Sequence, residues 1–512
     1  MSNDLAGTPK PKSSRRVRLS GLTIIVVAFA CVTLPVILKG APLLDDYYNC
    51  IAPNERGLGT VLAEVYDNLE LVRPAHYVEV ALTAGVCRVT SFSIMILVPW
   101  ALTIGVAFAI RGLLGDLGVA QPWRDIGASI WLLQPLGTEA ALWPAALHIP
   151  LGIGFAVLAA RAFFRNRMIT GTLLGLAACL SVEQAILVMP VIACLTPQSA
   201  RKRAVAATAT LAVGILILFA MFPGESHYTD VSLADRISNA FTDLDYYVVL
   251  PATAFGAHSI PLAIGWAFPI SAAVLVAGIW LGWAAGARSA LGSQVHRGVT
   301  TRGLWIAAAL LVLANIPVAV SHHPDSPRVF TPTWALIAVG AAIWASRVRW
   351  TRTRLWGGVA GALVAASLLS LSLSSWVRVR SATLSEVAHR DIASQAPDGA
   401  VVAVCDIERT MVSPAPTGDF ALHDFFAFTE DAYTYYTGEH ATFRKGGRYW
   451  EAPCPDISGT DVVVSFSEIT TSSSGSVTTS SGSRSRVARR APFQRSSVIA
   501  INVDTYDGNR RR

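Results

Sequence analysis

The chain has 512 residues, of which 53% are hydrophobic and only 15% are charged. These proportions exclude an ordinary soluble protein, whose core does not need so many apolar runs, and they indicate an integral membrane protein. The formal net charge of +7 comes with no array of spaced basic and aromatic residues, so the sequence predicts no nucleic-acid partner.

A basic arm, residues 1–20, precedes the first apolar stretch, residues 22–38. This stretch is long enough to cross a bilayer, and the residues after it lack the small-x-small signature of a cleaved signal peptide. We therefore expect a retained first helix. Lys and Arg collect on the cytoplasmic side of short loops, so the N-terminus should be cytoplasmic.

Apolar stretches predict a polytopic α-helical domain with about eleven transmembrane helices over residues 21–377. They are 22–38, 91–110, 126–136, 141–160, 168–181, 184–196, 204–222, 262–286, 303–320, 331–346 and 355–376. Three are too short to span comfortably, and short or broken helices occur at membrane depth only inside protein or beside a watery cavity. With this count every later basic loop faces the cytoplasm.

The acidic pair Asp45-Asp46 follows the first stretch and should lie at or just outside the outer membrane face. Two adjacent carboxylates there can act as a general base and its partner, hold a divalent cation, or cap a helix. The sequence therefore neither requires nor excludes a divalent cation. The amphipathic stretch 58–71, followed by Arg73, is typical of a helix that lies in the interface.

Later loops bring more polar residues to the same predicted face. They are Glu139, Glu183, Gln184, His322, His323 and Arg328. The acids interrupt apolar runs, where ionisable groups are costly and mark a polar cavity or a site, although an outer loop between short helices explains them too. The late histidines and arginine suit a phosphate, or they belong to a solvated loop.

The seven cysteines show no spacing typical of zinc ligands, so no metal ligands are predicted. Four lie in apolar stretches and are expected to be small buried hydrophobic residues: Cys31, Cys87, Cys179 and Cys194. Cys405 and Cys454 are a candidate disulfide in an oxidising compartment, which would leave Cys50 alone.

Residues 378–469 read as a small extracytoplasmic α/β or α+β domain. Its predicted elements are a helix at 379–394, a strand at 400–404, a helix at 427–437 and a strand at 461–466. Residues 470–512 are rich in Ser and Arg and should be largely disordered, with one closing strand at 497–503.

Taken together, these features resemble the GT-C superfamily of integral-membrane glycosyltransferases. The resemblance is carried by Asp45-Asp46 after the first helix, the interfacial segment, the short helices with Gly137-Thr138-Glu139 and Val182-Glu183-Gln184, a late arginine and an external C-terminal domain. It covers nearly the whole chain as architecture, through short motifs.

The resemblance implies a multi-pass protein of the plasma membrane that takes a sugar from a polyprenyl-phosphate donor. The acceptor would be an extracytoplasmic glycan, lipid or protein. Asp45 would be the general base and Asp46 would orient the acceptor, while Arg328 with His322 or His323 would face the departing phosphate. Arg73 and the remaining outer-face residues named above are the candidate substrate-binding residues.

Two other classes of function remain open. A transporter or lipid flippase also uses broken helices and acids within the membrane, but no internal repeat of matched length is evident and the acids cluster near the outer face. A non-catalytic scaffold or sensor would bind a ligand through its external domain and would have no need of Asp45.

Overall fold

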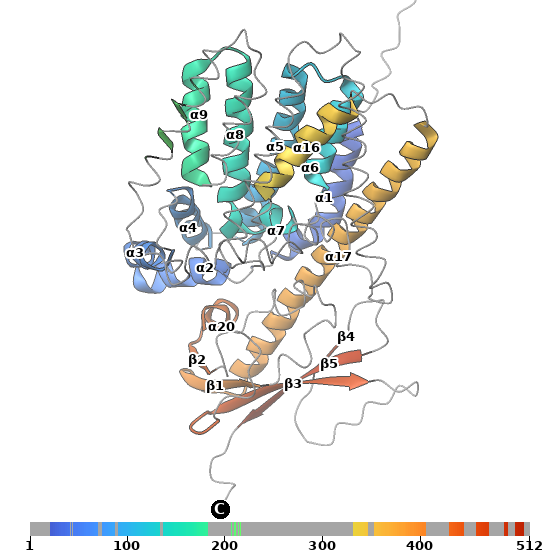
Figure 1. Ribbon diagram of the computed structural model, residues 1–512. Coiled ribbons are helices and arrows are strands. Elements are labelled where there is room, and N and C mark those ends of the chain that lie inside the picture. Colours follow the sequence, from blue (N-terminus) through green and yellow to red (C-terminus); the bar gives the residue numbers. More distant parts are fainter. Residues whose placement is uncertain are drawn as a thin grey trace, which may run out of the picture.

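The computed structural model describes part of the chain and is mostly helical there (Figure 1). The described residues are 21–40, 42, 45–69, 74–87, 91–133, 137–182, 206, 209–210, 213–214, 216, 331–346, 353–405, 430–444, 457–470, 486–489 and 497–505. The predicted spans 184–196, 204–222, 262–286 and 303–320 lie wholly or mostly outside these residues.

Three helical segments in the described part are long and apolar enough to cross a membrane: α1 (Gly21–Lys39), α5 (Ser93–Asp116) and Pro144–Phe164, which joins the 3₁₀ turn η1 (Pro144–Ala146) to α8 (His148–Phe164). At 1.5 Å per residue, α1 reaches roughly 28 Å, close to the thickness of the hydrocarbon core. The helices α9 (Met168–Ser181) and α16 (Thr331–Ala345) are apolar but shorter.

The helices form one apolar core in which α5 packs against α6 (Gln121–Leu132) and α8. Tryptophan side chains tie neighbouring helices together through hydrogen bonds. Trp131 of α6 donates to the Thr103 carbonyl of α5 at 2.9 Å, and Trp334 of α16 donates to the Ile130 carbonyl of α6 at 2.9 Å. Such bonds between helices supply directionality that apolar contacts inside a membrane lack.

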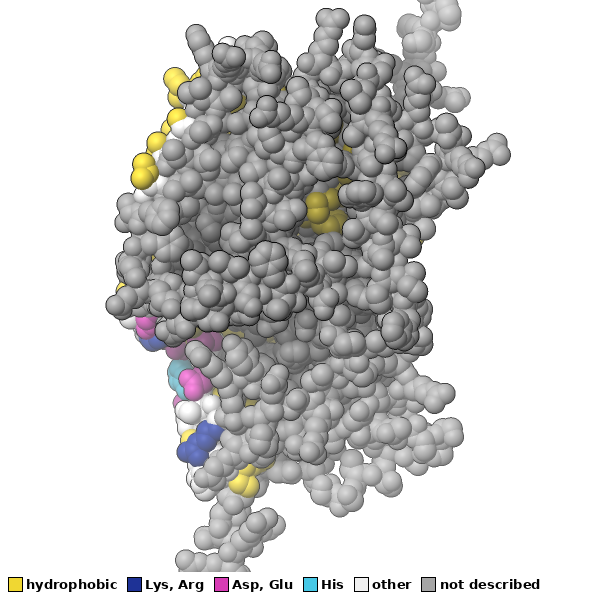
Figure 2. Space-filling model, viewed as in Figure 1, with side chains coloured by type: hydrophobic (Ala, Val, Ile, Leu, Met, Phe, Trp, Pro, Cys, Tyr) yellow, Lys and Arg dark blue, Asp and Glu magenta, His cyan; other side chains and the backbone are white. Residues whose placement is uncertain are grey.

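Successive helices run in alternate directions, which gives the bundle two distinct ends (Figure 1). The end of α1 and the starts of α5 and α8 lie at the end that faces the C-terminal sheet, which we call the sheet-side end. The start of α1 and the ends of α5 and α8 lie at the opposite end. Figure 2 shows hydrophobic side chains along the upper edge of the described surface, and acidic, basic and histidine side chains below.

Three short helices cover the sheet-side end: α2 (Asp45–Arg56), α3 (Leu58–Leu69) and α4 (Pro74–Cys87). Gly57 separates α2 from α3 with φ of 87°, a conformation that favours glycine. The helix α3 coincides closely with the amphipathic stretch expected at 58–71, and Val61 packs with Ala52 of α2 and Val80 of α4.

Cys50 of α2 and Cys87 of α4 form a disulfide, with their Cα atoms 5.7 Å apart. The expectation that Cys50 stays alone and that Cys87 is only a buried hydrophobic residue is therefore wrong. The two residues are 37 positions apart, and only the folding of α4 back onto α2 brings them together. The predicted pairing of Cys405 with Cys454 is not tested, because Cys454 lies outside the described residues.

The helix α17 (Thr353–Ala393) joins the bundle to the C-terminal sheet without a break (Figure 1). The sequence predicts a span at 355–376 and a separate helix at 379–394, whereas the structure has one helix of 41 residues. Its length of roughly 60 Å is about twice the hydrocarbon thickness of a bilayer. Lys39 at the end of α1 pairs with Glu386 of α17 at 2.7 Å.

The C-terminal sheet has five strands in the order β2-β1-β3-β5-β4. They are β1 (Ala400–Cys405), β2 (Ala441–Arg444), β3 (Val462–Thr470), β4 (Arg486–Arg489) and β5 (Ser497–Thr505). The strand β1 pairs in parallel with β2 and β3, while β5 pairs antiparallel with β3 and β4. The strands β4 and β5 lie in the segment 470–512, where composition predicts a largely disordered tail with one closing strand. The backbone hydrogen bonds that hold β5 in the sheet come from its nine-residue pairing with β3.

Candidate functional site

The acidic pair forms the first turn of α2, where carboxylates interact favourably with the positive end of the helix dipole. The two side chains have different surroundings, because Asp45 is exposed and Asp46 is fully buried. Of the two acids, only Asp45 is therefore accessible from outside the protein without a change in the packing of α2.

Asp46 holds α2 against the 3₁₀ turn η1, which precedes α8. Its Oδ1 accepts a hydrogen bond from the backbone N–H of Ala145 in η1, at 3.1 Å. The N–H groups of a first helical turn have no partner inside the helix, so a carboxylate from another element satisfies one of them. The bond positions the start of α2 at the sheet-side end of the bundle.

A tyrosine cluster joins the acidic pair to the C-terminal domain. Tyr47 is fully buried, and its hydroxyl lies 2.7 Å from that of Tyr436 in α20 (Glu430–Thr437). The ring of Tyr435 meets Tyr47 edge-on, with centroids 5.5 Å apart. Burial raises the pKa of Tyr47 and of Tyr436, so both hydroxyls stay protonated at neutral pH.

A histidine–glutamate cluster lies where α4 meets the start of α8. Glu79 is fully buried, its Oε1 lies 3.1 Å from His76 Nδ1, and its Oε2 lies 3.1 Å from His148 Nδ1. The Oε2 atom also accepts from the His148 backbone N–H at 3.3 Å. Burial raises the pKa of Glu79, but the two histidines outweigh this effect and leave the pKa below its ordinary value.

The outer surface of α2 carries a partly exposed polar cluster. Tyr48 donates to Glu64 of α3 at 2.6 Å, and the Arg56 guanidinium lies 2.9 Å from the same carboxylate and 5.3 Å from the centre of the Tyr48 ring. The imidazole of His440, after α20, lies 3.8 Å from Glu55. These contacts add a second link between α2 and the C-terminal domain.

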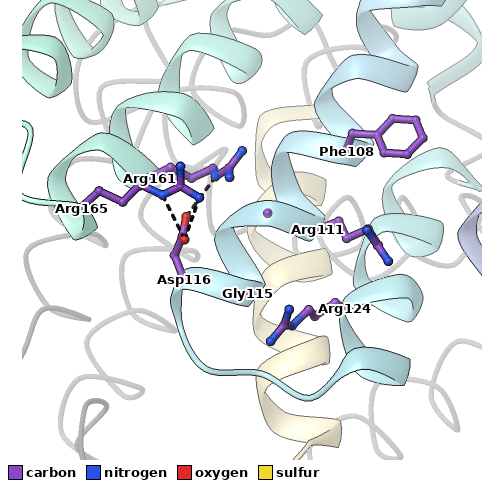
Figure 3. Close-up of a pocket in the computed structure, with 8 residues that line it drawn as sticks. Phe108, Arg111, Gly115, Asp116, Arg124, Arg161 and Arg165 are labelled. Carbon is purple, nitrogen blue, oxygen red and sulfur yellow. Dashed lines mark hydrogen bonds and ion pairs between the residues drawn. The ribbon is translucent and has the colours of Figure 1, made fainter.

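A cavity of about 360 Å³ lies at the opposite end of the bundle, between α5, α6 and α8 (Figure 3). Four arginines line it: Arg111, Arg124, Arg161 and Arg165. Asp116 accepts from Arg161 Nε at 3.0 Å and from Arg165 Nη2 at 3.0 Å. Beside the cavity, Arg111 Nε donates to Asp125 at 2.6 Å. Among the described residues that line the cavity, four arginines accompany one acid, so this end of the bundle is basic.

The structure places three of the candidate site residues and not the others. Asp45 and Asp46 lie side by side at the sheet-side end, and Glu139 lies in α7 (Gly137–Leu142), with its side chain outside what is described. The remaining candidates lie outside the described residues: Arg73, Glu183, Gln184, His322, His323 and Arg328. Whether these join the acidic pair stays a prediction.

Sequence reasoning missed the tyrosine contact and the histidine–glutamate cluster. The spacing His76-x-x-Glu79 does place two polar side chains on one face of α4, which is a signal that could have been read. His148 lies 69 positions beyond Glu79, and Tyr436 lies 389 positions beyond Tyr47. No local pattern predicts such partners.

No protein-family model and no curated protein matches this sequence.

Proposed function

We propose that this protein is a membrane glycosyltransferase of the GT-C type, which transfers a sugar from a polyprenyl-phosphate donor to a glycan, lipid or protein acceptor outside the cytoplasm. The observation that carries the proposal is the position of Asp45. It is an exposed acid at the start of α2, directly after the first membrane helix and beside the C-terminal domain.

The proposed orientation puts the sheet-side end outside the cytoplasm. Two independent features support it. The arginine-lined cavity is at the opposite end, and Lys and Arg are enriched on the cytoplasmic face. The Cys50–Cys87 disulfide is at the sheet-side end, and disulfides form and persist in oxidising compartments. The basic N-terminal arm, residues 1–20, agrees with both.

The chemistry requires a base and a fixed geometry. An acceptor hydroxyl is a weak nucleophile, so a carboxylate within hydrogen-bond reach assists as charge develops. Asp45 has the exposure for that role. Asp46, buried and bonded to Ala145, would hold the start of α2 in register with the bundle rather than touch the substrate. A polyprenyl chain would stay in the lipid beside the helices.

The test is sugar transfer in membranes that contain each variant, with a panel of radiolabelled polyprenyl-phosphate sugars as donors. Asp45→Asn preserves shape and removes the proton acceptor, so transfer should fall by roughly two to four orders of magnitude. Glu55→Gln neutralises another exposed acid on α2 and should transfer like the wild type. Immunoblots of each membrane preparation normalise the protein level.

Two outcomes would contradict the proposal. Transfer at the wild-type rate by Asp45→Asn would remove Asp45 as the base. The absence of transfer by the wild-type protein with every donor, together with movement of a lipid or solute that depends on Asp45, would favour the transporter class instead.

A further inference from the structure

His76, Glu79 and His148 bring three donors of metal-binding type together at one buried point. His76 and Glu79 are three positions apart on α4 and share a helix face, and His148 is the first residue of α8. The donor atoms of the three residues all lie within 4.8 Å of one another, and the two imidazole rings are 5.5 Å apart in an edge-on arrangement.

The hydrogen bonds of this cluster are incomplete among the residues that the structure describes. Glu79 Oε1 and His76 Nδ1 face each other at 3.1 Å, yet neither atom makes a hydrogen bond of acceptable geometry. Thr83, one turn further along α4, also has a buried hydroxyl without a partner there. A buried carboxylate oxygen that lacks a well-aligned hydrogen bond is costly, so the arrangement is one that a bound cation would stabilise.

We propose that His76, Glu79 and His148 bind a zinc ion that fastens α4 to the start of α8. Two imidazoles and one carboxylate are a typical donor set for zinc with an open fourth position, whereas calcium and magnesium prefer oxygen donors alone. Ligand atoms of a tetrahedral zinc ion lie roughly 3.3 Å apart, and the donor atoms of the cluster already lie within 4.8 Å of one another. This proposal does not depend on the proposed glycosyl transfer.

The site would also act on the acidic pair through the backbone. The His148 N–H bonds to Glu79, and the Ala145 N–H, three residues earlier, bonds to Asp46. A zinc ion on Glu79 and His148 would therefore fix the same turn that positions the start of α2. The zinc ion would thus have a structural role, because it would hold α4, η1 and α8 in place.

The experiment measures zinc in the full-length protein, purified in detergent without a polyhistidine tag and dialysed against buffer with added zinc. Elemental analysis of the wild type should give one zinc ion per chain, and replacement by cobalt should give the visible absorption of a low-coordinate site. Glu79→Gln is nearly isosteric and leaves an acceptor for the His148 N–H, and His76→Asn removes one ligand. Each of these two variants should bind zinc at least about tenfold more weakly than the wild type, because loss of a group that merely supports a ligand already has an effect of this size.

His440→Asn is the matched control, because His440 is exposed and lies outside the cluster. It should retain the zinc content of the wild type. Wild-type protein without zinc and without a cobalt spectrum would overturn the proposal and leave an ion-paired histidine–glutamate cluster. Equal zinc content in wild type, Glu79→Gln and His76→Asn would overturn it as well, by placing the metal elsewhere.

Discussion

Single residues at the start of α2 show how neighbours in sequence acquire different roles. Asp45 is exposed, Asp46 is bonded to Ala145, and Tyr47 is bonded to Tyr436. The sequence alone singles out the acidic pair and its place after the first helix. It cannot assign the roles, because the partner of Asp46 is 99 positions away and that of Tyr47 is 389 positions away.

The hydroxyl contact between Tyr47 and Tyr436 predicts a measurable coupling. Tyr47→Phe and Tyr436→Phe should each lower the stability of the folded protein by about 1 kcal/mol. Each substitution removes one hydroxyl and leaves the other without this hydrogen bond. The double variant should lose little more than either single one. The measurement is thermal unfolding in detergent. Additive losses would show that the two hydroxyls do not interact.

At the scale of elements, the sequence patterns predict the position of several helices and strands to within a few residues. The helix α3, the helix α20 and the strand β1 lie within a few residues of the expected 58–71, 427–437 and 400–404. The continuity of α17 was not predicted, since the sequence analysis expects a span that ends at residue 376 and a separate helix at 379–394. Contacts with α1 and α20 along its length keep the helix intact.

The contact between α6 and α16 depends on Gly127. A Cβ there would lie 2.6 Å from Leu114 Cδ1, 2.8 Å from the Ala342 Cβ and 3.1 Å from the Ala338 carbonyl oxygen. Gly127→Ala should therefore destabilise the protein by about 1–3 kcal/mol, because overpacking exceeds the gain in helix propensity. In α5, a Cβ at Gly105 meets nothing within 4 Å, so Gly105→Ala should be neutral or stabilising in the same thermal assay.

The disulfide between α2 and α4 predicts a defined chemical response. The double variant Cys50→Ser/Cys87→Ser should lose about 2–4 kcal/mol of stability, because the unfolded chain is no longer cross-linked. The wild-type protein is unfolded and alkylated with or without prior reduction. Mass spectrometry should find Cys50 and Cys87 alkylated only in the reduced sample. Alkylation of both cysteines without reduction would contradict the pairing.

At the scale of the whole molecule, the apolar segments predict a membrane protein, and three of the described segments are long enough to span. Spans of this kind can be predicted from the sequence because apolar length is a property of each segment alone. The association of the C-terminal domain with α2 depends instead on contacts between distant parts of the chain, through Tyr47 and Tyr436, which no segment reveals by itself.

The orientation across the membrane is testable with an impermeant thiol reagent. Ser458→Cys places a thiol on an exposed turn before β3, and Arg167→Cys places one between α8 and α9 at the opposite end. Intact cells should label Ser458→Cys above the background of the unsubstituted protein, and Arg167→Cys only after lysis. The reverse pattern would invert the topology and move Asp45 to the cytoplasm.

The long sequence separation within the tyrosine cluster has a consequence for the order of assembly. Tyr47 is made near the beginning of synthesis, and Tyr436 follows 389 residues later. At typical rates of translation the delay is roughly 20 to 80 s, during which the face of α2 that α20 later covers has no cover. The proposed site beside Asp45 would therefore be completed last, when α20 packs against α2, and a chain interrupted before α20 would lack this contact.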